Sequence, residues 1–222
     1  ALPICFESPT FIIGNPRSGT TLLRLMLSSH KKMMIPPECG FAVWYYKKYK
    51  NWKQLIETDI SIIDTFVADL FEAQKIENWK LDRAEILDHI FREKPHNYSS
   101  LVSCLYFFYG KRIRNSITKW GDKNNFYLNH IPTITEMFPK VKFIHIVRDG
   151  RSVMASYKSL GKKEIHSKYA PKLPDEVDTI ADEWNKNLAI VQNAFAAIES
   201  NQTIEIRFED LVLHPVEVLT KL

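Results

Sequence analysis

Apolar residues along this chain occur in two patterns, short runs and stripes with helical spacing. Runs at 10–14 and 141–147 and an alternating stretch at 203–208 predict strands. Each of the first two is followed by a short polar loop and then by a segment whose apolar residues recur every three or four positions, around Leu22 and Val153. Strands that alternate with helices in this way predict an α/β fold with a parallel sheet.

The remaining segments are predicted to be helical. Residues 42–118 predict mainly helices, 175–197 predict one long helix, and Pro215 opens a final helix. No repeat, low-complexity tract or flexible linker divides the chain, so we expect one domain over 1–222. In it, 42–118 is a helical insertion over the carboxyl edge of the sheet, where such folds bind ligands. The last helix breaks off at Leu222, so we expect an incomplete C-terminus.

Composition limits the classes of function. The 222 residues are 45% hydrophobic and 25% charged, which is typical of a globular protein. The net charge of +4 is mild, so we expect no nucleic acid as a partner, although local basic patches can still bind phosphates. No run reaches the roughly 18 apolar residues of a membrane span. With no secretory signal in residues 1–15, the cytoplasm is the expected location.

The cysteines give no sign of a disulfide framework or a metal site. Cys5, Cys39 and Cys104 are scattered, and no two have the spacing of a zinc or redox motif. They are predicted to be small buried residues or free thiols. No cluster of metal-ligating residues is evident in the sequence, so we expect no metal. The pattern leaves the oligomeric state open.

The loop after the first predicted strand carries candidate chemistry. Gly14 and Gly19 frame a G-x-x-x-x-G loop whose backbone N–H groups can bind an anion at a helix N-terminus. Thr20 stands where a nucleotide triphosphatase needs its lysine, and Arg17 is the only cation in the loop. An ordinary strand-to-helix turn has the same glycine frame. The added Arg-Ser and Thr-Thr pairs favour the anion site.

Residues 16–21, P-R-S-G-T-T, resemble the 5′-phosphosulfate loop of sulfotransferases that use 3′-phosphoadenosine-5′-phosphosulfate (PAPS). The resemblance implies a P-loop-like three-layer fold, with a central parallel sheet flanked by helices. It also implies a role for each loop residue. The basic residue contacts the bridging and sulfonate oxygens, and the hydroxyl residues hold the 5′-phosphate. These roles fall on Arg17, Ser18, Gly19, Thr20 and Thr21.

A second loop resembles the 3′-phosphate segment of the same family. Residues 147–151 read V-R-D-G-R, and the family expects an arginine at the strand end and a serine eight residues later. Arg148 and Ser156 match both positions, and an arginine offers a planar pair of donors to a phosphate. The alternative is that Arg148 and its neighbours are ordinary surface charges at the start of a helix. Phosphate sites after two neighbouring strands suit a ligand with phosphates at both ends of its ribose. PAPS and its product, 3′,5′-adenosine bisphosphate, are such ligands, whereas ATP is not.

Glu38 is the candidate general base. It lies 21 residues after Arg17, and a glutamate at that spacing is the base in tyrosylprotein sulfotransferases and many bacterial relatives. Cytosolic small-molecule sulfotransferases instead use a histidine in a K-x-H segment, which this chain lacks. His130 is in the right region with the wrong flanks, and His145 lies inside a predicted strand. An acceptor hydroxyl has to lose a proton as it attacks, which is the task expected of Glu38.

Two further segments resemble the family. Residues 120–123, W-G-D-K, resemble G-[DE]-K-T-P, so Lys123 is expected to stabilise the transferring group, but the sequence departs at Asn124 and Asn125. An ordinary surface lysine is the alternative. Residues 208–215 resemble [YF]-E-D-L-x-x-x-P, where the aromatic residue often lies near the nucleotide. Phe208 is therefore either a nucleotide neighbour or a plain strand end.

The helical insertion matches no known pattern. Its aromatic residues either line an acceptor pocket or, as we expect, form helix core: Trp44, Tyr45, Tyr46, Tyr49 and Trp52. The partner is therefore a hydroxyl acceptor of open class, a peptide tyrosine, a glycan, a lipid or a small alcohol. The resemblance predicts sulfonate transfer from PAPS without a metal. The alternatives are a P-loop kinase or nucleotide triphosphatase, and a non-catalytic module that binds adenosine phosphates.

Overall fold

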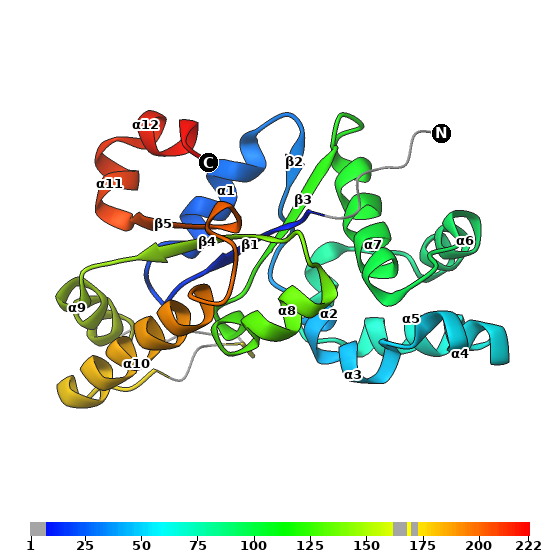
Figure 1. Cartoon of the computed structure of the whole chain (residues 1–222), viewed down its shortest axis with the longest axis horizontal. Helices are drawn as coiled ribbons and strands as arrows, with labels where there is room; N and C mark the ends of the chain where they lie inside the picture. Colours follow the sequence, from blue (N-terminus) through cyan, green and yellow to red (C-terminus); the bar gives the residue numbers. More distant parts are fainter. Residues whose placement is uncertain (1–7, 162–167, 170–172) are drawn as a thin grey trace.

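The computed structural model describes residues 8–161, 168–169 and 173–222 (Figure 1). Its strands form one sheet in which every neighbouring pair is parallel. The spatial order is β2 (Met33–Met34), β3 (Lys119–Lys123), β1 (Thr10–Ile13), β4 (Lys142–Val147) and β5 (Thr203–Arg207). This arrangement confirms the predicted α/β fold with a central parallel sheet.

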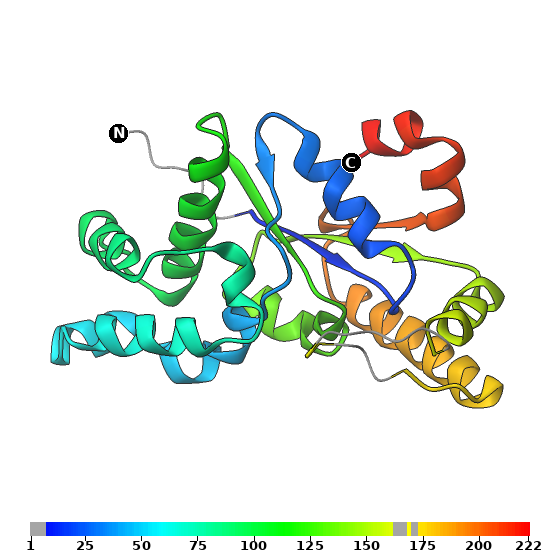
Figure 2. The same cartoon turned by 180° about the vertical axis from the view of Figure 1, so that it is seen from behind.

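Alternation along the strands gives the sheet two buried faces. Ile12 and Ile144 pack on one face, whereas their neighbours Phe11 and Phe143 pack on the other. The helices on the first face are α1 (Thr20–Ser29), α11 (Phe208–Leu213) and α12 (Pro215–Thr220). Those on the second face include α8 (Ile131–Met137) and α10 (Val177–Phe195). Figure 2 shows the two layers from behind.

The segment between β2 and β3 is mainly helical, as predicted. Its elements are α2 (Phe41–Trp44), α3 (Tyr46–Tyr49), α4 (Trp52–Thr58), α5 (Ile62–Glu72), a 3₁₀ helix (Ile76–Trp79), α6 (Arg83–Glu93) and α7 (Tyr98–Ile113). Helix α7 contacts β2 and β3 and begins with a reciprocal capping box between Asn97 and Ser100. In Figures 1 and 2, most of these helices lie beside the β2–β3 end of the sheet.

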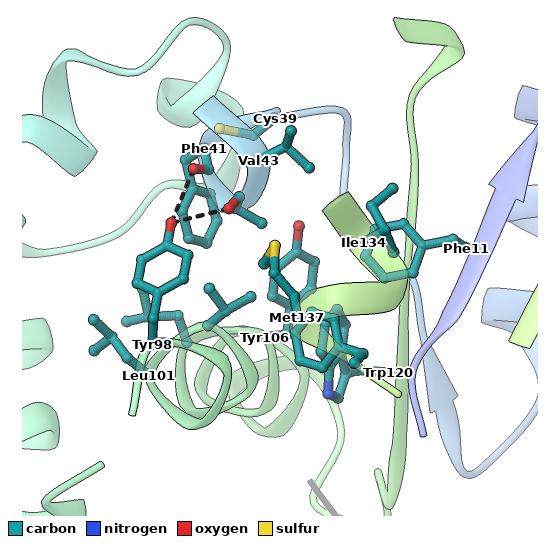
Figure 3. Close-up of a cluster of buried hydrophobic side chains, with 14 of the residues drawn as sticks. Phe11, Cys39, Phe41, Val43, Tyr98, Leu101, Tyr106, Trp120, Ile134 and Met137 are labelled. Carbon is teal, nitrogen blue, oxygen red and sulfur yellow. Dashed lines mark hydrogen bonds between the residues drawn. The ribbon is translucent and has the colours of Figure 1, made fainter. Parts of the chain in front are cut away.

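Aromatic side chains form the core of this helical segment. Tyr49 and Trp52 are fully buried, and the Trp52 Nε1–H donates to the Pro95 carbonyl at 3.0 Å. Figure 3 shows the Tyr98 hydroxyl donating to the backbone oxygens of residues 41 and 42, at 3.2 and 3.0 Å. For Tyr49 and Trp52 the expected core role is confirmed, whereas Trp44 is 39% exposed.

Strand β3 was not evident in the sequence because its five residues, K-W-G-D-K, are mostly polar. It is nevertheless buried between β1 and β2, with Thr10 opposite Gly121 and Met34 opposite Trp120. The other elements are α9 (Gly150–Gly161) and 3₁₀ helices at Asn125–His130 and Ser200–Gln202. Within the described residues, no helix is both long enough and apolar enough to cross a membrane.

The close approach of β3 to β1 predicts that Gly121→Ala destabilises the fold. A Cβ on Gly121 would lie 2.4 Å from the carbonyl oxygen of Thr10, so the strands would have to separate. We expect urea unfolding to show a loss of about 1–3 kcal/mol. At the matched site Gly150, a Cβ would meet the Trp184 ring at an ordinary 3.4 Å. Equal stability of Gly121→Ala and Gly150→Ala would contradict the packing described.

Candidate functional site

A charged cavity of about 400 Å³ opens where the loops after β1, β3 and β4 meet. Its lining comes from these loops, the loop after β2, the region before the 3₁₀ helix at 76–79, two described residues between α9 and α10, and the start of α11. The residues are Pro16, Arg17, Gly19, Thr20, Thr21, Glu38, Lys75, Lys123, Asn125, Arg148, Tyr169, Leu173 and Phe208. A second cavity, of about 470 Å³, lies at the amino ends of the strands, and its described lining includes no acidic side chain.

The loop after β1 turns sharply into α1. Gly19 caps the helix with a φ of 91°, and Arg17 also has a positive φ of 70°. A Cβ on Gly19 would lie 2.2 Å from the Phe208 ring, so both the backbone angle and the space favour glycine. Ser18 is fully buried, and its hydroxyl has no hydrogen-bond partner within the described structure. The unpaired N–H groups of the first turn of α1 make this loop suitable for an anion.

The loops after β1 and β4 touch each other. The Arg148 guanidinium donates through Nη1 to the Arg17 carbonyl at 2.9 Å, and the Arg17 Nε–H donates to the Ser156 hydroxyl at 3.0 Å. Arg148 also stacks 4.5 Å from the centre of the Phe208 ring. The structure therefore brings Arg17, Arg148, Ser156 and Phe208 together. Arg151, by contrast, is exposed and pairs with Asp149 at 2.7 Å.

Glu38 lies between two ammonium groups in this cavity. Its Oε2 pairs with Lys75 Nζ at 2.6 Å, and its Oε1 accepts a short hydrogen bond from Lys123 Nζ. Lys123 also donates to the Thr21 hydroxyl at 3.1 Å and is almost fully buried, with 3% of its side chain exposed. The candidate base, the second candidate cation and the end of the first loop thus meet at one point.

Burial and charge act on Glu38 in opposite directions. Burial raises the pKa of its carboxyl, but the charges and hydrogen bonds of Lys123 and Lys75 outweigh burial and leave the pKa below its usual value. Burial also lowers the pKa of Lys123, which the charge of Glu38 partly offsets. Glu38 is therefore ionised at neutral pH and able to accept a proton.

Asp122 anchors the end of β3 through buried hydrogen bonds. It is fully buried, and its Oδ2 accepts hydrogen bonds from the hydroxyls of Tyr106, at 2.5 Å, and Tyr127. Its Oδ1 accepts from the Lys123 backbone N–H at 2.7 Å. Burial raises the pKa of Asp122 to about 6 in spite of these three donors. Because Tyr127 also contacts the Cys39 carbonyl at 3.4 Å, the cluster ties the backbone of Lys123 to the segment that carries Glu38.

Lys75, Asp122 and Asn125 are site residues that the sequence analysis did not identify as candidates. Lys75 comes from the helical segment, which matched no pattern, and Asp122 was noted only as part of the W-G-D-K motif. Asn125 Oδ1 accepts from the Thr20 hydroxyl at 3.2 Å, at the point where the sequence departs from the family pattern. That departure is the one signal in the sequence that could have found it.

The remaining candidates lie elsewhere. His145 is buried and faces Glu205 at 2.9 Å, and neither it nor His130 is among the described lining residues of the cavity. None of the five aromatic residues between 44 and 52 is among them either, and from 42–118 the described lining includes only Lys75. Most of the insertion thus packs beside the sheet. The described residues contain no group of three or more histidine, cysteine or acidic residues placed to hold a metal ion.

Comparisons with known proteins show what the chain is similar to. The model of the sulfotransferase family matches residues 9–222. The chain is 22% identical over 212 residues to protein-tyrosine sulfotransferase A of Caenorhabditis elegans, covering 92% of this chain and 46% of that protein. It is 25% identical over 223 residues to protein-tyrosine sulfotransferase 2 of Gallus gallus, covering 94% and 48%. The chain spans about half the length of these two relatives.

Solved structures share the fold. The sulfotransferase domain of the Synechococcus PCC 7002 olefin synthase superposes with a TM-score of 0.59 at 21% identity, covering 97% of this chain and 71% of that one. The sulfotransferase domain of the curacin biosynthetic pathway superposes with a TM-score of 0.56 at 22% identity, covering 97% and 72%. At these identities the likeness supports the fold alone. Any argument about the chemistry has to come from the residues of the cavity.

The buried Asp122 cluster predicts that Asp122→Asn destabilises the chain. An amide places an NH₂ group where three donors need acceptors, so at least one donor is left unpaired. We expect urea unfolding at pH 7 to show a loss of about 1–3 kcal/mol. Asp88→Asn is the matched control, because Asp88 is 73% exposed in a surface pair with Arg92. If the two variants were equally stable, Asp122 would not anchor β3 as described.

Proposed function

The chain belongs to the sulfotransferase family, and from that premise we propose that it transfers a sulfonate group from PAPS to an acceptor hydroxyl, with Glu38 as the general base. The observation that carries the proposal is the ionised Glu38 carboxylate between Lys75 and Lys123, in the cavity where the two basic loops meet. The carboxylate can take the proton of the acceptor hydroxyl, and the neighbouring cations can stabilise the negative charge that develops on the leaving group.

The cavity suits a donor with several negative charges. Its described charged side chains are four cations, Arg17, Lys75, Lys123 and Arg148, and one carboxylate, Glu38. In the proposal, the backbone of residues 18–21 and the hydroxyls of Ser18, Thr20 and Thr21 bind the 5′-phosphate. The buried, unpartnered Ser18 hydroxyl supports this role, because a buried polar atom without a partner is unfavourable until something binds it.

Arg148 and Ser156 are proposed to bind the 3′-phosphate. Ser156 presently accepts a hydrogen bond from Arg17, and Arg148 has its Nε buried without a partner among the described residues. A phosphate between them would give both side chains a charged partner. Phe208, which stacks on Arg148 and covers Gly19, lies between the two proposed phosphate sites and offers an aromatic surface there.

The proposed reaction is a single displacement at sulfur. The acceptor oxygen forms a bond to sulfur while its proton passes to Glu38, and the bond from sulfur to the bridging oxygen of the 5′-phosphate breaks with its electron pair on that oxygen. Arg17 and Lys123 stabilise the negative charge that develops there. The hydrogen bond from Lys123 to Thr21 supports this assignment, because it holds the ammonium at the end of the phosphate loop.

Lys123 also bears on the kinase alternative. In P-loop kinases the lysine of the loop binds the outer phosphates, whereas here Thr20 occupies that position and points its hydroxyl at Asn125. The buried ammonium of this cavity comes from the neighbouring strand β3. A donor with a 3′-phosphate and a shorter 5′ group fits that placement better than a nucleoside triphosphate.

The proposed nucleotide site predicts selective stabilisation by 3′,5′-adenosine bisphosphate. At 100 times its Kd, a ligand adds about 2.7 kcal/mol to the free energy of unfolding, which raises the Tm by roughly 5–10 °C. We expect this shift in thermal unfolding with the bisphosphate, and a smaller one with 5′-AMP or with ATP and magnesium.

Two arginines close together in the sequence, Arg148 in the loop after β4 and Arg151 in the first turn of α9, provide the matched control. Arg148→Ala should abolish the shift, whereas Arg151→Ala should retain it, because Arg151 is exposed and pairs with Asp149. A shift with ATP and magnesium alone would contradict the proposal and favour the kinase-like alternative.

The role of Glu38 predicts that Glu38→Gln lowers kcat and leaves nucleotide binding intact. Removing a general base costs about 10²–10⁴ in rate. The assay follows label transfer from PAPS to panels of tyrosine peptides, glycans, lipids and small alcohols. Glu57→Gln is the control, since Glu57 is 64% exposed in a surface pair with Lys53. Equal losses of turnover and of bisphosphate binding would count against the role, and binding without turnover in the unmutated protein would favour a non-catalytic module.

A further inference from the structure

Lys75 is a charged residue of the cavity to which neither the sequence patterns nor the comparisons give a role. It lies just before the 3₁₀ helix at 76–79, and its backbone has a positive φ of 69°, which is uncommon for a residue other than glycine. Its backbone N–H donates to the Tyr169 hydroxyl at 3.1 Å. Four residues later, the Trp79 Nε1–H donates to the Pro37 carbonyl at 2.8 Å. The segment that carries Lys75 is therefore anchored directly to the loop that carries Glu38.

The two lysines hold the two oxygens of Glu38 separately. Lys123 pairs with Oε1 from the buried side, and Lys75 pairs with Oε2 at 2.6 Å from the more open side, where 29% of its side chain is exposed. A single ion pair would leave the carboxylate free to rotate about its last bond, whereas two partners on different oxygens fix its plane. Because each carboxylate oxygen can accept more than one hydrogen bond, Oε2 can still receive a proton with Lys75 in place.

We propose that Lys75 is a positioning residue for Glu38: with Lys123 it holds the carboxylate in one orientation and keeps it charged, and it thereby sets the lowest pH at which Glu38 can accept a proton. This inference rests on the proposed role of Glu38 as base. The positive φ of Lys75 and the anchors at Tyr169 and Trp79 are consistent with a side chain whose direction is held by the fold.

The charges around Glu38 determine the sign of the expected effect. Lys123 and Asp122 face it from β3, and Arg24 of α1 acts on Lys123. Burial raises the pKa of the adjacent Cys39 thiol to about 12, so that group stays neutral. Lys75 stabilises the charged carboxylate, so its removal raises the pKa of Glu38. Activity that depends on ionised Glu38 is then lost at a higher pH as the solution is acidified.

The experiment measures the titration of Glu38 directly and compares it with turnover. Glutamate labelled with ¹³C at the carboxyl carbon gives an NMR signal for Glu38, which is assigned by its loss in Glu38→Gln. Lys75→Met removes the ammonium and keeps an unbranched side chain one atom shorter, and Lys75→Arg keeps the charge. Lys80→Met is the matched control, because Lys80 also has a positive φ, of 50°, and is an exposed lysine of the same segment.

We expect the Glu38 titration, and the acidic limb of kcat/KM with it, to move to higher pH in Lys75→Met. Lys75→Arg and Lys80→Met should stay close to the unmutated protein. A Glu38 titration that is the same in Lys75→Met and Lys80→Met would overturn the proposal. If the titration moves as expected but the unmutated protein transfers no sulfonate, the effect of Lys75 on Glu38 stands and the proposed function fails. The NMR measurement thus separates the two.

Discussion

Parallel pairing of β1 with β3 on one side and β4 on the other decides where the charged groups of this chain meet. Strands that run in the same direction deliver the residues after them to one edge of the sheet. The register places Ile12 beside both Lys123 and Ile144, so the loops after all three strands open into the same space. Arg17 and Arg148 are 131 residues apart, and it is this pairing that brings them into contact. The charged cavity therefore forms where parallel pairing brings the ends of these strands together.

Within that cavity, the cost of burying charge explains which side chains are paired. A buried ammonium is unfavourable without a partner, and Lys123 has Glu38 and Thr21 as partners. Asp122 holds the same residue by its backbone. The result is a carboxylate that is held in place and ionised, which limits reorganisation during the proposed reaction. The arginines of the two loops make contacts with neutral groups instead: Arg148 donates to the Arg17 carbonyl, and Arg17 donates to the Ser156 hydroxyl.

The sequence predicted those parts of the molecule whose signal is contiguous. β1, β4 and β5 were found because their runs are apolar or alternating, and both basic loops were found because their motifs follow a strand directly. β3 was missed because its burial comes from pairing with β1 and β2, which the polar run K-W-G-D-K does not reveal. Lys75 was missed for a related reason: 37 residues separate it from Glu38, and only the folded chain brings them together. Glu38 became a candidate because its spacing from Arg17 resembles that of the family. The pattern of apolar and polar residues alone would not have singled it out.

A crystal structure with 3′,5′-adenosine bisphosphate tests the central claim most directly, that this cavity is a nucleotide site with a phosphate at each of two loops and a fixed carboxylate beside them. We predict the 5′-phosphate against the backbone N–H groups of residues 18–21 and the 3′-phosphate between Arg148 and Ser156. Glu38 should remain between Lys75 and Lys123, within reach of the space beyond the 5′-phosphate. A nucleotide bound at the other cavity, or bound here with its 3′-phosphate away from Arg148, would contradict this account of the site.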